Sequence, residues 1–151
     1  MATNLISHDD VQNYYGKVLA STQDLKTSAC CSAEALPAPA RKAFDLLPPE
    51  ITERFYGCGS PIPPAIDGCT ILDLGCGTGR DSFLCAKLVG ENGRVIGVDM
   101  TPEQIAVAQR NETVVARAFG HSVPNTQFHQ GYMEDLADAG VADERVDVVI
   151  S

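Results

Sequence analysis

The sequence has no tryptophan and few basic residues. Its 151 residues include 11 Lys and Arg against 20 Asp and Glu, which gives a formal net charge of −9. Binding to nucleic-acid phosphates needs a basic face, and no cluster of lysine or arginine occurs anywhere in the chain. We therefore expect no nucleic-acid partner, and solubility is the simplest role for the acidity.

Long apolar runs are also missing. None approaches the roughly 18 residues that a membrane span requires. Residues 1–10 lack the basic region followed by an apolar core that marks a signal peptide. These absences predict a cytoplasmic protein with no membrane partner. The hydrophobic fraction of 44% is ordinary for a folded protein, and the length allows one domain.

The six cysteines include no paired C-x-x-C zinc pattern. Cys69 and Cys85 fall within expected core elements and are interpreted as small buried hydrophobes. Cys30 and Cys31 are adjacent in a polar loop, where exposed thiols carry an oxidation risk. Cys58 lies between two glycines on an expected turn. A structural role stays an alternative for these three, and in the cytosol all six would be reduced.

One stretch, residues 70–81, organises the rest of the chain. A short apolar strand leads into a turn with Gly75, Gly77 and Gly79, and an amphipathic helix follows. Glycines permit a tight turn and let backbone N–H groups approach a ligand. In such sites an acid about 20 residues later, at the end of the next strand, holds ribose hydroxyls. Asp99 stands 20 residues after Gly79.

The second half of the chain alternates strands with helices. The expected strands are 70–74, 94–98, 126–129 and 145–151, and the expected helices are 79–89 and 102–119. This order predicts an α/β fold with a parallel, Rossmann-like sheet and helices on both faces. Because the last strand is apolar and nothing follows to cover it, we interpret the sheet as incomplete and the chain as truncated after strand 4.

The first half is expected to be helical and irregular. Helices are predicted at residues 8–20, 41–47 and 50–56. The apolar stripe of the first helix indicates packing, with a cover over a ligand as the alternative. The sequence thus suggests two parts, an amino-terminal helical and cysteine-loop extension (1–68) and a cofactor-binding core (69–151).

The spacing of the turn favours one cofactor class. The glycines follow G-x-G-x-G rather than the G-x-G-x-x-G of NAD sites, and Asp73 precedes the first glycine by two residues. A carboxylate there would repel a pyrophosphate but would suit the amine and sulfonium of S-adenosylmethionine. The motif Asp-x-Gly-x-Gly-x-Gly resembles the first motif of the class I S-adenosylmethionine methyltransferases. A glycine turn that binds nothing is the alternative.

This resemblance implies a set of cofactor-binding residues: Tyr56, Asp73, Gly75, Gly77, Gly79, Asp99, Met100, Met133 and Glu134. Asp73 and the turn backbone would hold the methionine end, and Asp99 would hold the ribose hydroxyls. Met100 would pack on the adenine face, while Met133 and Glu134 would surround the adenine amino group. Packing in the protein core is the alternative for the two methionines.

Nearly the whole chain is similar to the arsenite S-adenosylmethionine methyltransferases. The matching segments are 11–16 with Tyr14-Tyr15-Gly16, 25–30, 55–59, 72–81, 97–101 and 131–134. The thiol positions are the specific part of this resemblance, because other class I methyltransferases lack them. It implies Cys30 and Cys58 as arsenic-binding and catalytic thiols, with Cys31 able to assist. It also implies a thiol–disulfide relay that a thioredoxin- or glutathione-type reductant resets.

The implied chemistry suits these residues. Trivalent arsenic is soft and binds thiolates, and three thiolates would leave its lone pair free to attack the sulfonium methyl. No general base is then needed, and catalysis would consist mostly of positioning. Cys76 faces the cofactor and is a weaker candidate for a third sulfur. The family's later thiol pair would lie beyond Ser151.

Two other functions stay open. The chain could bind S-adenosylmethionine or arsenite without turnover, or it could methylate another small molecule, with incidental cysteines. We expect a monomer in each case.

Overall fold

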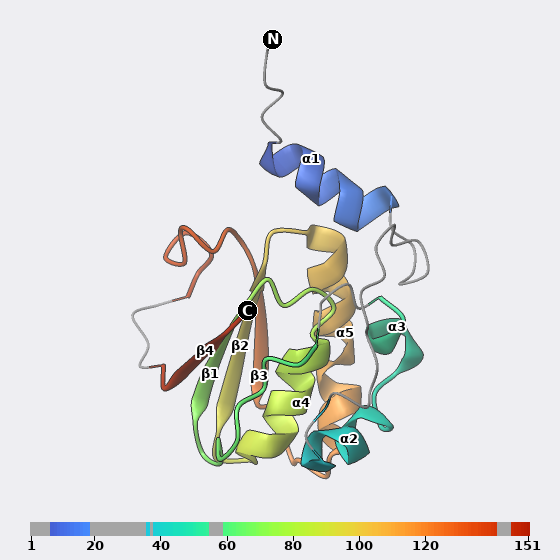
Figure 1. Cartoon of the computed structure of the whole chain (residues 1–151), viewed down its shortest axis with the longest axis vertical. Coiled ribbons are helices and arrows are strands. Elements are labelled where there is room, and N and C mark those ends of the chain that lie inside the picture. The colour runs from blue at the N-terminus through green and yellow to red at the C-terminus, as the bar shows by residue number, and fades with distance from the viewer. Residues whose placement is uncertain (1–6, 19–35, 37, 55–58, 142–145) are drawn as a thin grey trace.

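The computed structural model describes residues 7–18, 36, 38–54, 59–141 and 146–151. Its centre is a sheet of four parallel strands in the order β3-β2-β1-β4 (Figure 1). The strands are β1 (Thr70–Leu74), β2 (Arg94–Asp99), β3 (Thr126–Gln130) and β4 (Val148–Ile150). The predicted Rossmann-like parallel sheet is therefore confirmed. The strand order reverses at β1, where ligands bind in open α/β sheets.

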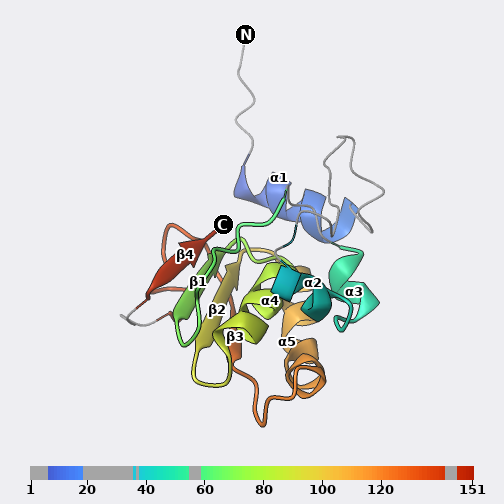
Figure 2. The ribbon, with the colours of Figure 1, turned by 60° about the horizontal axis from the view of Figure 1, so that its bottom comes forward.

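Two long helices cover one face of the sheet. They are α4 (Arg80–Val89) and α5 (Pro102–Ala118), and the shorter α2 (Ala38–Phe44) and α3 (Pro49–Thr52) pack outside them (Figures 1 and 2). The expectation of helices on both faces is wrong for the described residues. On the opposite face, Leu72, Ile96 and Val98 pack against side chains that follow β3, those of Leu136, Ala139, Val141 and Val146.

The observed bounds differ little from the expected ones. β1 and α5 match their predicted ranges to within a residue, whereas β4 is shorter than expected and begins at Val148, directly after a bend at residue 147. α2 begins three residues earlier than predicted, at Ala38. In the described part of the chain, no helix combines the length and the apolar character needed to cross a bilayer.

The predicted first helix divides into two pieces, α1 (His8–Asn13) and a π-helical turn, η1 (Tyr14–Val18). Ser7 and Asp10 form a capping box that fixes the start, as the side chain of each accepts from the backbone N–H of the other. None of the residues 8–18 is buried. The segment lies above the carboxyl ends of the strands in both ribbon views (Figures 1 and 2). The cover that the sequence left as an alternative therefore fits better than core packing.

The main core joins the sheet to α4 and α5. Phe83 of α4 and Phe128 of β3 meet edge to face, with ring centroids 5.2 Å apart. Leu36 and side chains of α2 and α3 belong to the same cluster. The division into an extension (1–68) and a core (69–151) stays a prediction.

A glycine in β2 makes room for this aromatic pair. A Cβ at Gly97 would lie 2.7 Å from Phe128 Cδ1 and 2.9 Å from Cys76 Sγ. Such distances force neighbours to move, and overpacking a core costs about 1–3 kcal/mol.

We therefore expect Gly97→Ala to lower the free energy of unfolding by about 2 kcal/mol in urea titrations. Phe128→Ala, which removes the ring that collides, should make the added methyl less costly in the double variant, although the close approach to Cys76 Sγ remains. An equal cost of Gly97→Ala with and without Phe128 would show that the ring is not the obstacle.

Candidate functional site

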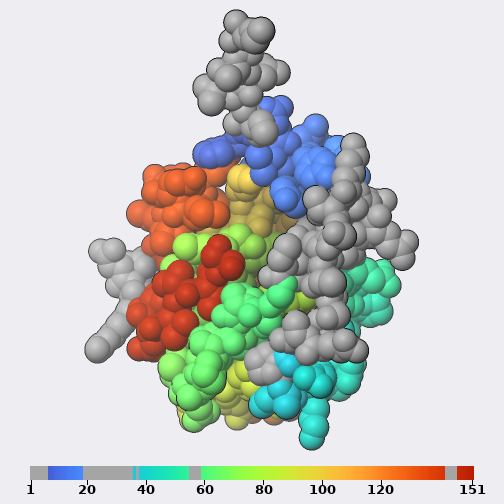
Figure 3. All heavy atoms as spheres, in the orientation of Figure 1, coloured from blue at the N-terminus to red at the C-terminus, as the bar shows by residue number. Residues whose placement is uncertain are grey.

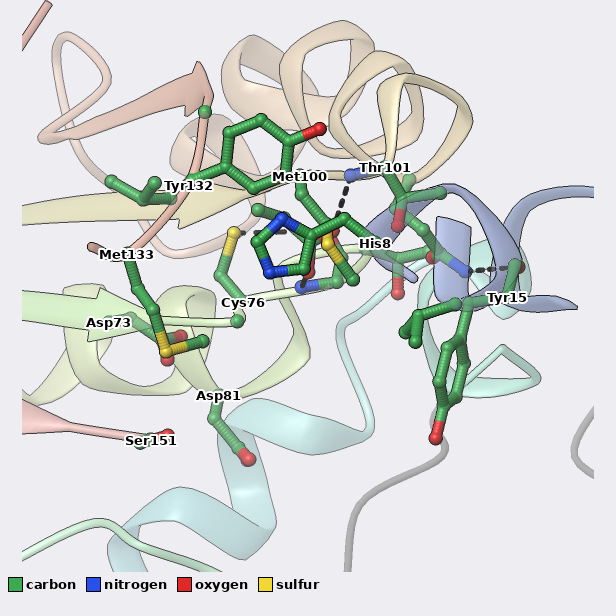
Figure 4. A pocket seen from close by; sticks show the side chains of 18 of the residues that line it. His8, Tyr15, Asp73, Cys76, Asp81, Met100, Thr101, Tyr132, Met133 and Ser151 are labelled. Atoms are coloured by element: carbon green, nitrogen blue, oxygen red, sulfur yellow. Dashed lines mark hydrogen bonds between the residues drawn. The ribbon is translucent and has the colours of Figure 1, made fainter. Parts of the chain in front are cut away.

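A cleft of about 490 Å³ opens at the carboxyl edge of the sheet. Its walls are the glycine turn after β1, the end of β2, the segment after β3, and the side chains of α1 and η1 that face them (Figure 4). Parallel strands place their carboxyl ends together, so chain segments distant in sequence converge here. The described residues lining the cleft include seven of the predicted cofactor residues: Asp73, Gly75, Gly77, Asp99, Met100, Met133 and Glu134.

The glycines of the turn serve two purposes. A Cβ at Gly75 would meet no atom within 4 Å, so the space beside it is open to a ligand. Gly77 also lines the cleft. Gly79 is buried and does not line it; a Cβ there would lie 2.9 Å from Phe128 Cζ. The third glycine thus allows α4 to approach β3, and its role in cofactor binding stays a prediction.

Asp73 brings a carboxylate into the cleft from the sheet interior. Asp73 is only 4% exposed, and Ser82 Oγ donates a hydrogen bond to Asp73 Oδ2 at 2.5 Å. Burial raises the pKa of Asp73 to about 7; the nearby charges of Asp81 and Asp99 act in the same direction, and the Ser82 hydrogen bond opposes them. A cation in the cleft would favour the ionised carboxylate.

Asp99 ties the glycine turn to the end of β2. Its Oδ2 accepts from the Gly77 N–H and its Oδ1 from the Thr101 N–H, both at 2.8 Å. Each carboxylate oxygen can accept about two hydrogen bonds, so both oxygens retain capacity for ligand hydroxyls. Thr101 is the N-cap residue of α5, but its side chain makes no capping hydrogen bond.

The sequence analysis missed a buried ion pair at the start of α4. Arg80 Nη2 lies 2.9 Å from Asp81 Oδ1, and the two side chains are 5% and 11% exposed. Arg80 Nη2 also donates to Gly59 O at 3.1 Å. Asp81 and Gly59 both line the cleft. The sequence shows Arg80 and Asp81 side by side after the third glycine. The contact between Arg80 and Gly59 spans 21 residues, and no sequence pattern indicates it.

Gln104 was also missed. It is 5% exposed and lines the cleft from the first turn of α5. Its Nε2 donates to Tyr15 O at 3.2 Å. Its buried Oε1 has no hydrogen-bond partner among the residues that the structure describes. Buried polar atoms are nearly always hydrogen-bonded, so this oxygen marks a place where a ligand would donate.

The opposite end of the cleft holds the predicted adenine residues. Met133 is 51% exposed, which excludes its alternative role in the protein core, and Met100 is half-buried. The His8 ring stacks on Tyr132 with centroids 4.8 Å apart, and His8 Nε2 lies 3.8 Å from Glu134 Oε1 (Figure 4).

The predicted thiol residues Cys30, Cys31 and Cys58, together with Tyr56, lie outside the described residues. Their roles as arsenic ligands, catalytic thiols and a cofactor contact stay predictions. Among the described residues, no group of three His, Cys, Asp or Glu side chains is arranged to hold a metal ion.

The described cysteines are poor candidates for soft-metal ligands. Cys85 is fully buried as expected, and Cys69 is half-buried against the core. Cys76 lines the cleft, but burial raises the pKa of its thiol well above the usual value, and the charges of Asp73 and Asp99 add to this effect. Since the thiolate is the metal-binding form, these surroundings disfavour Cys76 as an arsenic ligand.

The fold and the cleft define a Rossmann-like protein with a site for a nucleoside-type ligand, and sequence comparison agrees. A family model described as "Methyltransferase domain" matches residues 66–151, more than half of the chain. The chain belongs to this family of methyltransferase domains.

Relatives of the chain include enzymes named arsenite methyltransferase. The enzyme of Aquipseudomonas alcaligenes is 50% identical over 144 residues, covering 95% of this chain and 41% of that protein. The human enzyme is 42% identical over 143 residues, covering 94% of this chain and 38% of that protein. The chain thus spans about two fifths of the length of these relatives.

A solved structure supports the same relationship. The arsenic (III) S-adenosylmethionine methyltransferase of Chlamydomonas reinhardtii superposes with a TM-score of 0.72 at 47% identity. The match covers 76% of this chain and 38% of that one. The resemblance to arsenite methyltransferases that the sequence suggested is confirmed.

The ion pair at the start of α4 yields a stability prediction. Arg80→Met removes the cation and leaves the Asp81 carboxylate buried without its partner, which should cost about 3 kcal/mol in urea unfolding at pH 8. Adding Asp81→Asn should recover a large part of that loss. A single variant as stable as the wild type would mean that the pair contributes nothing.

Proposed function

We propose that the cleft binds S-adenosylmethionine and that the chain forms the cofactor-binding part of an arsenic methyltransferase. The observation that carries the proposal is the buried Asp73 carboxylate at the glycine turn, with Asp99 bonded to the same turn. The similarity to enzymes named arsenite methyltransferase supports the acceptor.

The residues present fit this cofactor. The cleft of about 490 Å³ is of the size of small-molecule sites. Four of its lining side chains are carboxylates, and they suit a ligand with a positive charge and would repel a pyrophosphate: Asp73, Asp81, Asp99 and Glu134. Gln104 Oε1, which has no partner among the described residues, needs a donor, and an ammonium or a ribose hydroxyl would supply one.

When bound, the cofactor supplies a methyl group made electrophilic by the sulfonium. Asp73 and the backbone of the glycine turn would hold its methionine end, and Asp99 its ribose. Met100, Met133 and Glu134 would surround the adenine, with Tyr56 as a further contact. Gly79 would contribute by keeping the turn close to β3.

For the acceptor, we propose trivalent arsenic held by Cys30 and Cys58, with Cys31 in support. Thiolates are the ligands that soft metalloids prefer, and the arsenic lone pair would attack the methyl without a general base. Cys58 directly precedes Gly59, whose carbonyl is bonded to Arg80 at the cleft wall. A thioredoxin- or glutathione-type reductant would reset the thiols, and we propose a cytoplasmic monomer.

A second candidate is binding without turnover. The chain spans about two fifths of the length of its relatives, so cofactor or arsenite binding by this chain does not by itself establish catalysis. Methylation of another small molecule is the remaining candidate. The two experiments below separate binding of the cofactor from binding of the acceptor.

Cofactor binding should depend on pH through Asp73. Burial raises the pKa of Asp73 to about 7, and the ammonium group of the ligand binds better to the ionised carboxylate. The affinity for S-adenosylhomocysteine should therefore be constant above pH 8 and fall below pH 7, by up to about tenfold per pH unit. Calorimetric titration between pH 5.5 and 8.5 measures this change.

The matched variant is Asp73→Asn, which keeps the shape and removes the charge. It should bind S-adenosylhomocysteine at least tenfold more weakly at pH 8, and its affinity should be nearly independent of pH over the same range. Wild-type affinity, or an unchanged pH slope in this variant, would refute the role of Asp73.

Arsenite binding should depend on the thiols of Cys30 and Cys58. Cys30→Ser and Cys58→Ser should each weaken arsenite binding by at least tenfold, because a thiolate ligand is lost. Affinity for S-adenosylhomocysteine should stay within twofold. Equilibrium dialysis with arsenic quantified in each chamber gives the affinities.

Cys69→Ser is the control, since this half-buried cysteine does not line the cleft. If the Cys30 and Cys58 variants retain arsenite affinity, these thiols do not hold arsenite and their proposed role is refuted.

A further inference from the structure

The amino-terminal segment 8–18 is docked on the cofactor cleft by a small number of specific contacts. Gln12 Nε2 donates to Met100 O at 2.6 Å, and the His8 ring stacks on Tyr132. Gly16 lies so close to α5 that a Cβ there would be 2.7 Å from Glu103 Oε2. In the space-filling view the segment abuts residues that follow β3 (Figure 3). Since none of its residues is buried, these contacts rather than core packing hold it.

Gln104 makes a contact of a different kind. One end of its side-chain amide faces Tyr15 of the segment, and the other end faces the cleft. Tyr15 O can only accept a hydrogen bond, so the atom of Gln104 that faces it must be Nε2. The amide orientation is then fixed, and the other atom is the acceptor Oε1. This oxygen is buried at the cleft and lacks a partner among the described residues.

The place of Oε1 indicates which ligand group it would meet. It lies 3.9 Å from the position of a Cβ on Gly77, whose N–H donates to Asp99. The proposed function gives Asp99 the ribose hydroxyls. A ribose hydroxyl beside Asp99 is therefore the donor nearest to Gln104, whereas the ammonium would lie towards Asp73.

We propose that Gln104 is a positioning residue that couples occupancy of the cleft to docking of segment 8–18. A ribose hydroxyl that donates to Oε1 fixes the amide and so holds Nε2 towards Tyr15 O. The inference rests on the proposed cofactor function and adds a consequence to it. Because coupling is reciprocal, the ligand strengthens docking of the segment and the docked segment strengthens ligand binding.

Two further contacts of the segment agree with this coupling. Gln12 binds the carbonyl of Met100, and His8 lies beside Glu134. Both partners are proposed adenine residues, so the ligand and the segment bind the same side of the cleft. A segment held through ligand-binding residues is well placed to respond to the ligand.

Hydrogen exchange of the amides in segment 8–18, read by mass spectrometry, tests the coupling in the whole chain. In the wild type, saturating S-adenosylhomocysteine should slow this exchange at least fivefold. In Gln104→Leu the ligand-dependent slowing should disappear at saturation, even though more ligand is needed. A purely structural contact would raise exchange equally with and without ligand and leave the ratio unchanged, which would overturn the proposal.

The control is Gln109→Leu. Gln109 lies on the same helix, also donates from its side-chain amide to a backbone carbonyl (Phe128 O, 3.0 Å), and does not line the cleft. It should keep the wild-type ratio. Gln104→Glu, a second variant of unchanged shape, keeps an acceptor for the ligand but lacks the donor to Tyr15 at pH 8. It should bind the ligand and lose the slowing.

The choice of ligand separates the possible failures. 5′-Methylthioadenosine carries the ribose but no ammonium, and it should slow exchange as S-adenosylhomocysteine does. Slowing by S-adenosylhomocysteine alone would reject the ribose as the donor. If the wild type binds S-adenosylhomocysteine without any slowing, only the coupling fails. If the wild type fails to bind it, the proposed function fails as well.

Discussion

The site depends on a concentration of negative charge that the fold holds at the end of β1. Asp73 is buried in the sheet, Asp99 is tied to the glycine turn, and Asp81 stands at the start of α4. Arg80 compensates Asp81, and Asp73 has the Ser82 hydroxyl as a partner. Such a cleft is costly when empty and ionised, and a cationic ligand relieves that cost. Its electrostatics thus explain why a sulfonium cofactor fits where a dinucleotide does not.

Much of this arrangement could be predicted because it is local in sequence. The apolar run 70–74, the glycine turn and the acid at position 99 place the strand, the turn and the proposed ribose site within 30 residues. The alternation of strands and helices along the chain predicts parallel strands, whose carboxyl ends lie at one edge of the sheet. The glycine pattern did not reveal which glycine faces the ligand. That distinction depends on where Phe128, 49 residues after Gly79, places its ring.

The residues that sequence missed depend on distant partners. Gln104 meets Tyr15 across 89 positions, and Arg80 meets Gly59 across 21. In both contacts the acceptor is a backbone carbonyl. Every residue type has one, so the sequence does not indicate which residue will accept the hydrogen bond. The expectation of helices on both faces failed for a similar reason. The segment after β3 covers the second face with side chains and no helical period.

The same acidity that favours a cationic cofactor limits where thiol chemistry can occur. Burial raises the pKa of Cys85 to about 12, and the charges of Asp73 and Asp81 contribute to that rise. Cys76, beside Asp73 and Asp99, is affected in the same direction. A thiolate that binds a soft metalloid at neutral pH needs surroundings without these carboxylates. This agrees with the proposed function, in which Cys30 and Cys58 rather than Cys76 or Cys85 would hold the arsenic.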